Sequence, residues 1–232
     1  MHPGQNVINF TENLRLVRER IGAAAALARR DPAGIRLVAV SKRHGPEAVR
    51  AVFGAGQRDF GENQLQEALP KIESCSLDRL RWHFIGPLQS NKTRKVAEHF
   101  HWVHTLDRYK IAKRLSEQRP RYAGPLQVCL QVNVANEAQK AGIPPGEALV
   151  LAQQVAELPH LALRGLMCIP PMEDSYEQQC RHFACLRICL ERLSEQGLNL
   201  DILSMGMSAD LEAAIAQGST MLRIGTAIFG PR

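Results

Sequence analysis

Three short strings near the ends of predicted strands place an amine beside groups that can bind an anion. They are Ala39-Val40-Ser41-Lys42, Ser204-Met205-Gly206-Met207-Ser208 and Arg223-Ile224-Gly225-Thr226. Lys42 follows an apolar run, residues 35–40, of the kind found in strands buried on both faces of a parallel sheet. A buried lysine amine at such a strand end suits Schiff-base chemistry. Alternatively, Lys42 only marks the point where the strand reaches solvent.

The other two strings offer hydrogen-bond donors for a phosphate. Ser208 ends a predicted strand ahead of a predicted helix, so its hydroxyl can bind an anion or cap that helix. Gly225 allows the backbone to approach a ligand closely, and Thr226 adds an N–H and a hydroxyl. Gly206 either clears space for the ligand or marks a strand irregularity, and the sequence leaves both open.

Arg223, Asn63 and His83 are further polar residues on predicted strands. Alternation places Arg223 on one face with Met221 and Gly225. If that face lines the interior, the guanidinium needs an acceptor, which a ligand or a nearby carboxylate can supply. Asn63 ends a strand, where it can contact a ligand or cap the next helix. His83 lies in an apolar strand, so we interpret it as a hydrogen-bonded core residue and not as a catalytic one.

An alternation of strands and helices positions these residues. The predicted strands are residues 35–42, 58–63, 82–86, 102–106, 127–134, 163–170, 201–208 and 221–229. Helical patterns begin near Pro46, Gln64, Ser90, Asp107, Pro145, Ser175 and Asp210, and a further helix, residues 11–29, precedes the first strand. This order predicts a (β/α)8 TIM barrel with an extra N-terminal helix, in a single domain over residues 1–232. An open doubly wound sheet is the alternative.

Barrel closure has a direct consequence for the three strings. It brings the first, seventh and eighth strands together and places Lys42, Ser208 and Arg223 around one mouth. In such barrels the active face lies at the C-terminal strand ends, and phosphate often binds after strands seven and eight. We therefore expect a phosphate-binding site at this face.

Composition argues against several classes of protein. The chain has 232 residues, 45% of them hydrophobic, and no stretch approaches the roughly 20 apolar residues of a membrane helix. Residues 1–10 lack the features of a secretory signal, so we expect a cytoplasmic location and no membrane partner. The net charge of +6 is scattered and only 5% of residues are aromatic, so we expect no nucleic-acid partner.

The cysteines and clustered histidines do not indicate a metal site. The six cysteines form no CxxC pair, and we interpret them as reduced thiols that pack in the core. His99, His101 and His104 are close in sequence but straddle a predicted helix end and a strand. We therefore expect no bound metal.

Several long motifs in order resemble the pyridoxal phosphate homeostasis proteins, which look like the barrel domain of alanine racemase standing alone. The resemblance extends from about Asn13 to Pro231. Besides the three opening strings, the last of which continues through Ala227-Ile228-Phe229-Gly230, it rests on Phe60-Gly61-Glu62-Asn63 and Trp82-His83-Phe84-Ile85-Gly86-Pro87-Leu88-Gln89-Ser90-Asn91-Lys92.

The resemblance implies pyridoxal 5′-phosphate (PLP) as cofactor, held as an internal aldimine on Lys42. The implied cofactor-binding residues are Lys42, Asn63, Ser208, Arg223, Gly225 and Thr226. Ser208, Gly225 and Thr226 would hold the phosphate, and Asn63 would lie near the ring. Arg223 would be the partner of the pyridine nitrogen and keep it unprotonated, so that the ring withdraws electrons less strongly.

One segment departs from the resemblance. Lys42 is followed by Arg43-His44-Gly45-Pro46, where relatives commonly carry a second lysine and a proline nearby. The role of this loop in cofactor exchange or secondary binding stays open.

The resemblance leaves two functions to separate, PLP homeostasis and amino-acid racemisation. Racemases of this type take a second base from a separate β domain, whereas this chain ends at Arg232, and Tyr109, Tyr122 and Tyr176 have no clear catalytic setting. We therefore expect a PLP carrier of vitamin B6 homeostasis without strong turnover. A Schiff-base aldolase also fits a barrel but explains Arg223 less well.

The expected ligands and partners follow from this reading. They are PLP and related B6 vitamers, with PLP-dependent apoenzymes as candidate recipients. A monomer is the default, because no separate dimerisation element is visible.

Overall fold

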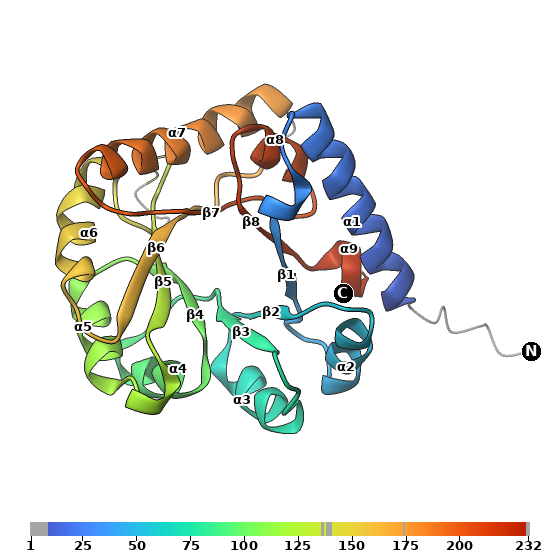
Figure 1. The fold of residues 1–232 in the computed structure, drawn as a ribbon, viewed down its shortest axis with the longest axis horizontal. Helices are drawn as coiled ribbons and strands as arrows, with labels where there is room; N and C mark the ends of the chain where they lie inside the picture. Colours follow the sequence, from blue (N-terminus) through green and yellow to red (C-terminus); the bar gives the residue numbers. More distant parts are fainter. Residues whose placement is uncertain (1–8, 136, 138–140, 174, 231–232) are drawn as a thin grey trace, which may run out of the picture.

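Eight parallel strands close into a barrel in sequence order within the part of the chain that the structure describes (Figure 1). This computed structural model describes residues 9–135, 137, 141–173 and 175–230. The strands are β1 (Arg36–Val40), β2 (Asp59–Glu62), β3 (Arg81–Phe84), β4 (Trp102–Leu106), β5 (Leu126–Gln131), β6 (Leu161–Met167), β7 (Ile202–Ser204) and β8 (Met221–Ile224). β8 pairs with β1, where Val38 lies opposite Arg223. The predicted barrel is confirmed, and the open doubly wound alternative is wrong.

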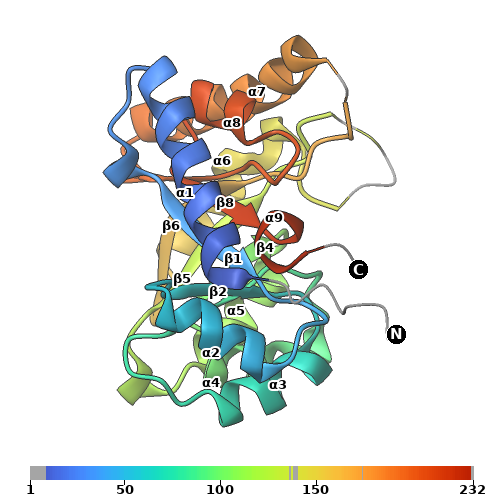
Figure 2. The same cartoon turned by 90° about the vertical axis from the view of Figure 1, so that its right-hand side faces the viewer.

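Helices surround the barrel (Figures 1 and 2). They are α1 (Phe10–Leu27), α2 (Pro46–Gly54), α3 (Leu65–Ser74), α4 (Thr93–His99), α5 (Tyr109–Gln118), α6 (Ala148–Ala156), α7 (Tyr176–Glu195), α8 (Leu211–Ala216) and α9 (Thr226–Phe229). Short 3-10 turns precede α4 at Ser90–Lys92 and α6 at Pro145–Glu147. The helix starts therefore agree with the sequence patterns to within a few residues.

The extra N-terminal helix α1 lies along α8 and α9 (Figure 1). The Asn13 side-chain amide donates to the Ile228 carbonyl at 3.0 Å. Arg20 pairs with Glu212 of α8 at 2.5 Å. These contacts join the beginning of the described chain to its last two helices.

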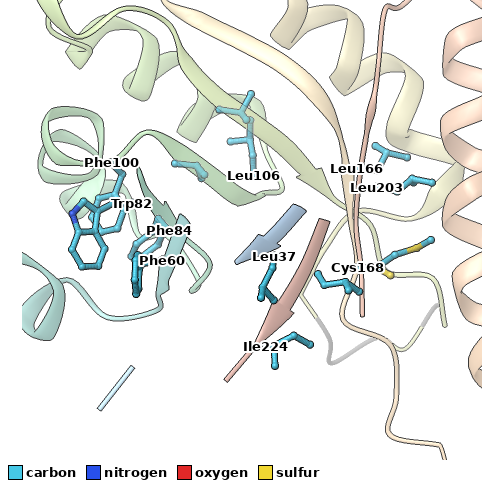
Figure 3. Packing of buried hydrophobic residues seen from close by; sticks show 14 of the residues in the cluster. Leu37, Phe60, Trp82, Phe84, Phe100, Leu106, Leu166, Cys168, Leu203 and Ile224 are labelled. Atoms are coloured by element: carbon cyan, nitrogen blue, oxygen red, sulfur yellow. The ribbon is translucent and has the colours of Figure 1, made fainter. Parts of the chain in front are cut away.

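Strand side chains alternate between two apolar clusters, as a pleated strand requires. Outward residues such as Phe60, Leu203 and Ile224 pack in the main core between strands and helices (Figure 3). A second cluster consists of Val38, Trp102, Cys129, Met167, Ile202 and Met221, which fill the barrel interior. Because Met221 belongs to the inner cluster and Ile224 to the outer one, the alternation that directs Arg223 inward is confirmed.

Two of the strands that lead to the expected site, β1 and β7, end earlier than the sequence predicted. β1 ends at Val40, which leaves Lys42 in a turn, and β7 ends at Ser204, so Ser208 does not end a strand. Gly206 has a φ of +99°. The backbone N–H of the next residue, Met207, donates to the Asp210 carboxylate at 2.5 Å. This turn, which needs a left-handed residue, stops β7.

The last four residues of the predicted eighth strand form the short helix α9 instead. An apolar run of this length is compatible with either a strand or a buried helical turn. The backbone N–H groups of Ile228 and Phe229 both donate to the Gly225 carbonyl at 2.9 Å. Phe229 is fully buried, with its ring centroid 5.9 Å from that of Phe10 in α1. Packing against α1 therefore favours the helical turn.

Among the described residues, no helix is long and apolar enough to cross a membrane, and no group of His, Cys, Asp and Glu is arranged to hold a metal ion. The six cysteines are free thiols, four of them buried. The expectation about a secretory signal falls mainly on residues 1–8, which lie outside the described residues.

Candidate functional site

A pocket of about 410 Å³ lies at the C-terminal ends of the barrel strands. Its wall comes from the segments that follow β1, β2, β3, β6 and β7, and from β8 with the start of α9. The lining residues are Val40, Lys42, His44, Asn63, Ile85, Gly86, Pro87, Ile169, Met207, Ser208, Ala209, Arg223, Gly225, Thr226 and Gly230. All six residues that were expected to bind the cofactor line this one pocket.

Lys42 is half-buried in the turn after β1, and so it is less enclosed than the sequence suggested. The backbone before it is fixed: the Ser41 N–H donates to the Gly61 carbonyl at 3.0 Å. The Ser41 carbonyl accepts from the His44 N–H at 3.1 Å, which closes the turn around Lys42. The position of the amine is therefore set by the β1–α2 turn and by pairing with β2.

A buried ion pair supports this turn from the helix side. Lys71 of α3 lies 2.6 Å from Glu62 and donates to the Ser41 carbonyl at 2.9 Å, and the Ser41 hydroxyl donates to Glu62 at 2.6 Å. Glu62 is fully enclosed and Lys71 nearly so. Burial raises the pKa of the Glu62 carboxyl, and the nearby ammonium opposes that rise. Because Ser41 precedes Lys42 and Glu62 precedes Asn63, the pair braces two pocket segments.

Asn63 is not the cap of the following helix. The N-cap position of α3 is held by Gln64, so the capping alternative is wrong. Asn63 lines the pocket instead. A Cβ atom at Gly86 would lie 2.0 Å from the Asn63 carbonyl oxygen. Gly86 is therefore required for the close approach of the β3–α4 segment to Asn63.

Ser208 also lines the pocket without capping a helix. Asp210 precedes α8, and the Ser208 carbonyl accepts from Arg20 at 2.8 Å. A Cβ atom at Gly206 would lie 2.6 Å from the Ala214 Cβ of α8. Together with its positive φ, this contact favours the strand irregularity over ligand clearance for Gly206, which is not in the lining.

Arg223 brings a buried positive charge to the pocket. The residue is 4% exposed, its Nη1 donates to the Ser204 hydroxyl at 2.8 Å, and its Nη2 donates to the Cys168 carbonyl at 2.9 Å. Burial lowers the pKa of Arg223, but a guanidinium stays protonated in proteins. From the sequence, a nearby carboxylate was an open alternative as the acceptor for Arg223. Among the described residues, its guanidinium donates instead to a neutral hydroxyl and a neutral carbonyl.

His83 is a hydrogen-bonded core residue, as predicted. It is fully buried, with Nε2 2.9 Å from Asp59 and Nδ1 2.9 Å from His104. Its ring stacks on Trp102 at 5.4 Å between centroids. Burial lowers the pKa of His83, partly opposed by the Asp59 carboxylate, so the imidazole is neutral near pH 7.

His44 is a pocket residue that the sequence analysis did not single out. Its ring stacks on Phe229 with centroids 4.9 Å apart, and this contact places the imidazole beside the pocket. The partner lies at the other end of the chain, so only the closed barrel brings the two together. In the sequence, the only indication that His44 belongs to the site was that its loop departs from the common family pattern.

Comparisons with known proteins identify the family of this chain. The family model described as alanine racemase, N-terminal domain, matches residues 7–232. Among curated relatives, the pyridoxal phosphate homeostasis protein of Pseudomonas aeruginosa is 57% identical over 223 residues, which cover 96% of each chain. That of Escherichia coli K12 is 50% identical over 227 residues, or 97% of each chain. The chain belongs to the pyridoxal phosphate homeostasis protein family.

The structure of this chain is similar to solved structures of PipY and of an alanine racemase. PipY of Synechococcus elongatus PCC7942 with PLP bound is 37% identical, with a TM-score of 0.82 over 96% of this chain and 100% of that one. Alanine racemase from Corynebacterium glutamicum is 16% identical, with a TM-score of 0.74 over 96% of this chain and 60% of that one. The second likeness shows a shared barrel fold.

Proposed function

We propose that this protein binds PLP in the strand-end pocket through Lys42 and serves PLP homeostasis inside the cell. The observation that carries the proposal is the meeting of an amine, a buried guanidinium and hydroxyl donors in one pocket. The relative PipY, which shares the fold at 37% identity, has a structure with PLP bound. The relatives from P. aeruginosa and E. coli carry the corresponding name.

The pocket fits a molecule of this kind. Its volume of about 410 Å³ lies within the roughly 300–1,000 Å³ typical of small-molecule sites. Apolar walls from Ile85, Pro87 and Ile169 suit the faces of a ring. The charged and hydroxyl groups of Arg223 and Ser208 suit an anionic ligand.

Each predicted residue has a role in this proposal. When bound, PLP supplies an aldehyde that forms a Schiff base with an amine by losing water, and Lys42 is the amine. Ser208, Gly225 and Thr226 offer hydroxyl and backbone N–H donors to the phosphate. Arg223 can only donate hydrogen bonds, so it would hold a ring nitrogen in its unprotonated form. Asn63 would contact the ring from the β2 side.

Homeostasis is favoured over racemisation by the depth of the similarity. The curated relatives that match across nearly the whole chain at 50% identity or more are homeostasis proteins. The alanine racemase from C. glutamicum matches at 16% identity, a level that supports the fold alone. We therefore assign no catalytic residue.

Titration with PLP tests the assignment of Lys42. We expect the unaltered protein to develop the absorbance of a Schiff base and Lys42→Ala to lose it while it keeps the same thermal unfolding midpoint. Lys113→Ala, which changes an exposed lysine of α5, serves as the matched control and should bind as the unaltered protein does. A Lys42→Ala protein with an unchanged spectrum contradicts the proposal.

We propose further that the protein is a single-domain cytoplasmic monomer that delivers PLP to PLP-dependent apoenzymes. Sedimentation velocity should then give the mass of one chain, 25.8 kDa, and unfolding should occur in one transition. Reactivation of an apoenzyme should be faster from the loaded protein than passive release of PLP allows. A dimer mass, or reactivation limited by passive release, would overturn the corresponding part.

A further inference from the structure

A line of polar side chains, here called the polar chain, crosses the barrel interior from Asp59 to Arg223. Asp59 Oδ1 lies 2.9 Å from His83 Nε2. His83 Nδ1 lies 2.9 Å from His104 Nε2, and His104 Nδ1 lies 2.8 Å from Ser204 Oγ. Arg223 Nη1 donates to the same Ser204 oxygen at 2.8 Å. Five residues on β2, β3, β4, β7 and β8 are thus joined, and all five are buried.

The polar chain reaches solvent at the end opposite the pocket. Arg81 donates from Nε and Nη2 to the two oxygens of Asp59, both at 2.7 Å. The Arg81 side chain is 46% exposed. Burial raises the pKa of Asp59, but the hydrogen bonds from His83 and Arg81 outweigh it and leave the pKa below its ordinary range. The far end of the polar chain is therefore a carboxylate at neutral pH.

The two ends determine the direction of every hydrogen bond between them. A guanidinium only donates and a carboxylate only accepts. His83 must therefore donate from Nε2 to Asp59 and, as a neutral ring, accept at Nδ1 from His104. His104 then accepts at Nδ1 from the Ser204 hydroxyl, whose oxygen accepts from Arg223. Each link has one donor and one acceptor when both histidines are neutral Nε2–H tautomers.

Burial makes this arrangement the favourable one. The pKa values of His83 and His104 are both lowered, chiefly by burial, so neither ring takes up a second proton near pH 7. A proton added to His83 would convert its acceptor at Nδ1 into a donor and reverse the links toward Arg223. Hydrogen bonds aligned in one direction in a low-dielectric interior also polarise one another.

We infer that Asp59, His83, His104 and Ser204 are positioning residues that hold the Arg223 guanidinium in one orientation at the pocket. Ser204 holds Arg223 directly, and the other three residues orient the Ser204 hydroxyl. The Asp59 carboxylate supplies the opposite charge from across the barrel. The effect on the cofactor rests on the proposed function: Arg223 would present a fixed donor to the ring nitrogen.

The hydrogen-bond direction can be tested in the protein without ligand. Nitrogen-15 NMR of labelled histidine distinguishes protonated from unprotonated ring nitrogens. At neutral pH, we expect His83 and His104 to be neutral Nε2–H tautomers, each assigned by the signal lost on its substitution by Gln. An Nδ1–H tautomer or a doubly protonated ring at either position would overturn the inference, whether or not the protein binds PLP.

Two variants test the effect on the pocket. Ser204→Ala removes the link to Arg223 and should weaken PLP binding about tenfold, as expected for a lost hydrogen bond to a charged group. Asp59→Asn keeps an acceptor for His83 but removes the charge, and it should shift the absorbance maximum of bound PLP. Both variants should keep the fold by circular dichroism.

The control is Asp201→Asn, which removes a carboxylate paired with Arg164 just before β7 and outside the polar chain. It should leave PLP affinity and the spectrum unchanged. If Asp59→Asn and Ser204→Ala match this control, the positioning role is wrong. If the unaltered protein fails to bind PLP, the proposed function is wrong, while the NMR result still decides the polar chain.

Discussion

Glu62 and Lys71 form a buried ion pair beside the pocket. Glu62 Oε1 accepts from both Lys71 and Ser41, whereas its Oε2 has no hydrogen-bond partner among the described residues. Because only one of the two carboxylate oxygens has hydrogen-bond partners, the stability of the buried Glu62 carboxylate depends strongly on the Lys71 ammonium. The pair therefore stabilises the Lys42 and Asn63 segments only while both partners remain.

Removal of Lys71 tests this dependence. Lys71→Met leaves the Glu62 carboxylate buried without its cation, and breaking such a pair costs about 3–5 kcal/mol of the free energy of unfolding. Urea unfolding measures the loss. Lys113→Met, which removes an exposed lysine 4.0 Å from Glu117, is the matched control and should unfold near the midpoint of the unaltered protein. Equal midpoints for the two variants would show that the buried pair contributes little.

The six residues predicted for the site share properties that a sequence displays. Lys42, Asn63 and Ser208 each follow a strand, and Arg223 lies within one, so strand order and alternation placed them at one mouth, whereas their roles toward a cofactor came from the family resemblance. The Ser41–Glu62–Lys71 cluster was missed because Lys71 looks like an ordinary surface residue of an amphipathic helix. Only the packing of α3 against the barrel reveals its burial.

At the scale of elements, the junction between β7 and α8 is a sterically constrained turn near the pocket. Gly206 has a positive φ, and a side chain there would collide with Ala214 and Leu222. The turn also determines where Ser208 lies relative to the pocket. Its geometry should therefore affect both stability and binding.

A pair of glycine substitutions tests this constraint. Gly206→Ala should lower the free energy of unfolding, because Cβ would lie 2.6 Å from the Ala214 Cβ and the φ is unfavourable for alanine. Gly22→Ala is the matched control in the interior of α1, where a Cβ meets nothing within 4 Å. It should stabilise the protein by up to about 1 kcal/mol. Thermal unfolding distinguishes the two, and a neutral Gly206→Ala would contradict the packing argument.

Element boundaries were harder to predict than element types. Periodicity indicated the eight strands and helices α1 to α8, but it extended the seventh strand to Ser208 and the eighth through the residues that form α9, to Phe229. In the first case the left-handed turn at Gly206 intervenes. In the second, burial of Phe229 against Phe10 favours a helical turn. Both causes are contacts between distant segments or backbone angles that apolar patterns do not encode.

At the scale of the whole molecule, closure of the barrel converts residues from separate strands into two connected features. One is the pocket at the strand ends, and the other is the polar chain through the interior. The number and order of strands were sufficient to predict the barrel and its pocket. The polar chain was not predictable, because the pairing of His83 with His104 depends on ring positions inside the closed barrel.

The buried histidines predict how stability depends on pH. His83 and His104 stay neutral in the fold, whereas unfolded histidines take up protons near pH 6.5. The folded-state pKa is thus the lower one, and stability falls as pH falls below about 6.5, by up to about 1.4 kcal/mol per pH unit for each histidine. His104→Gln should show a shallower dependence in urea unfolding between about pH 6.5 and 5.

The control for this dependence is His160→Asn, which changes an exposed histidine with a φ of +63° to a residue that tolerates such an angle. Its pH dependence should match that of the unaltered protein. An unchanged slope in His104→Gln would mean that His104 is protonated in the fold.

Borohydride reduction of the PLP-treated protein, followed by peptide mass mapping, tests the central claim most directly. Reduction makes a Schiff base permanent, so the modified lysine can be read from the peptide that carries it. We expect the label on Lys42, in the turn that lines the pocket. A label on Lys71 or another lysine, or no label at all, would contradict the assignment of this pocket as the PLP site.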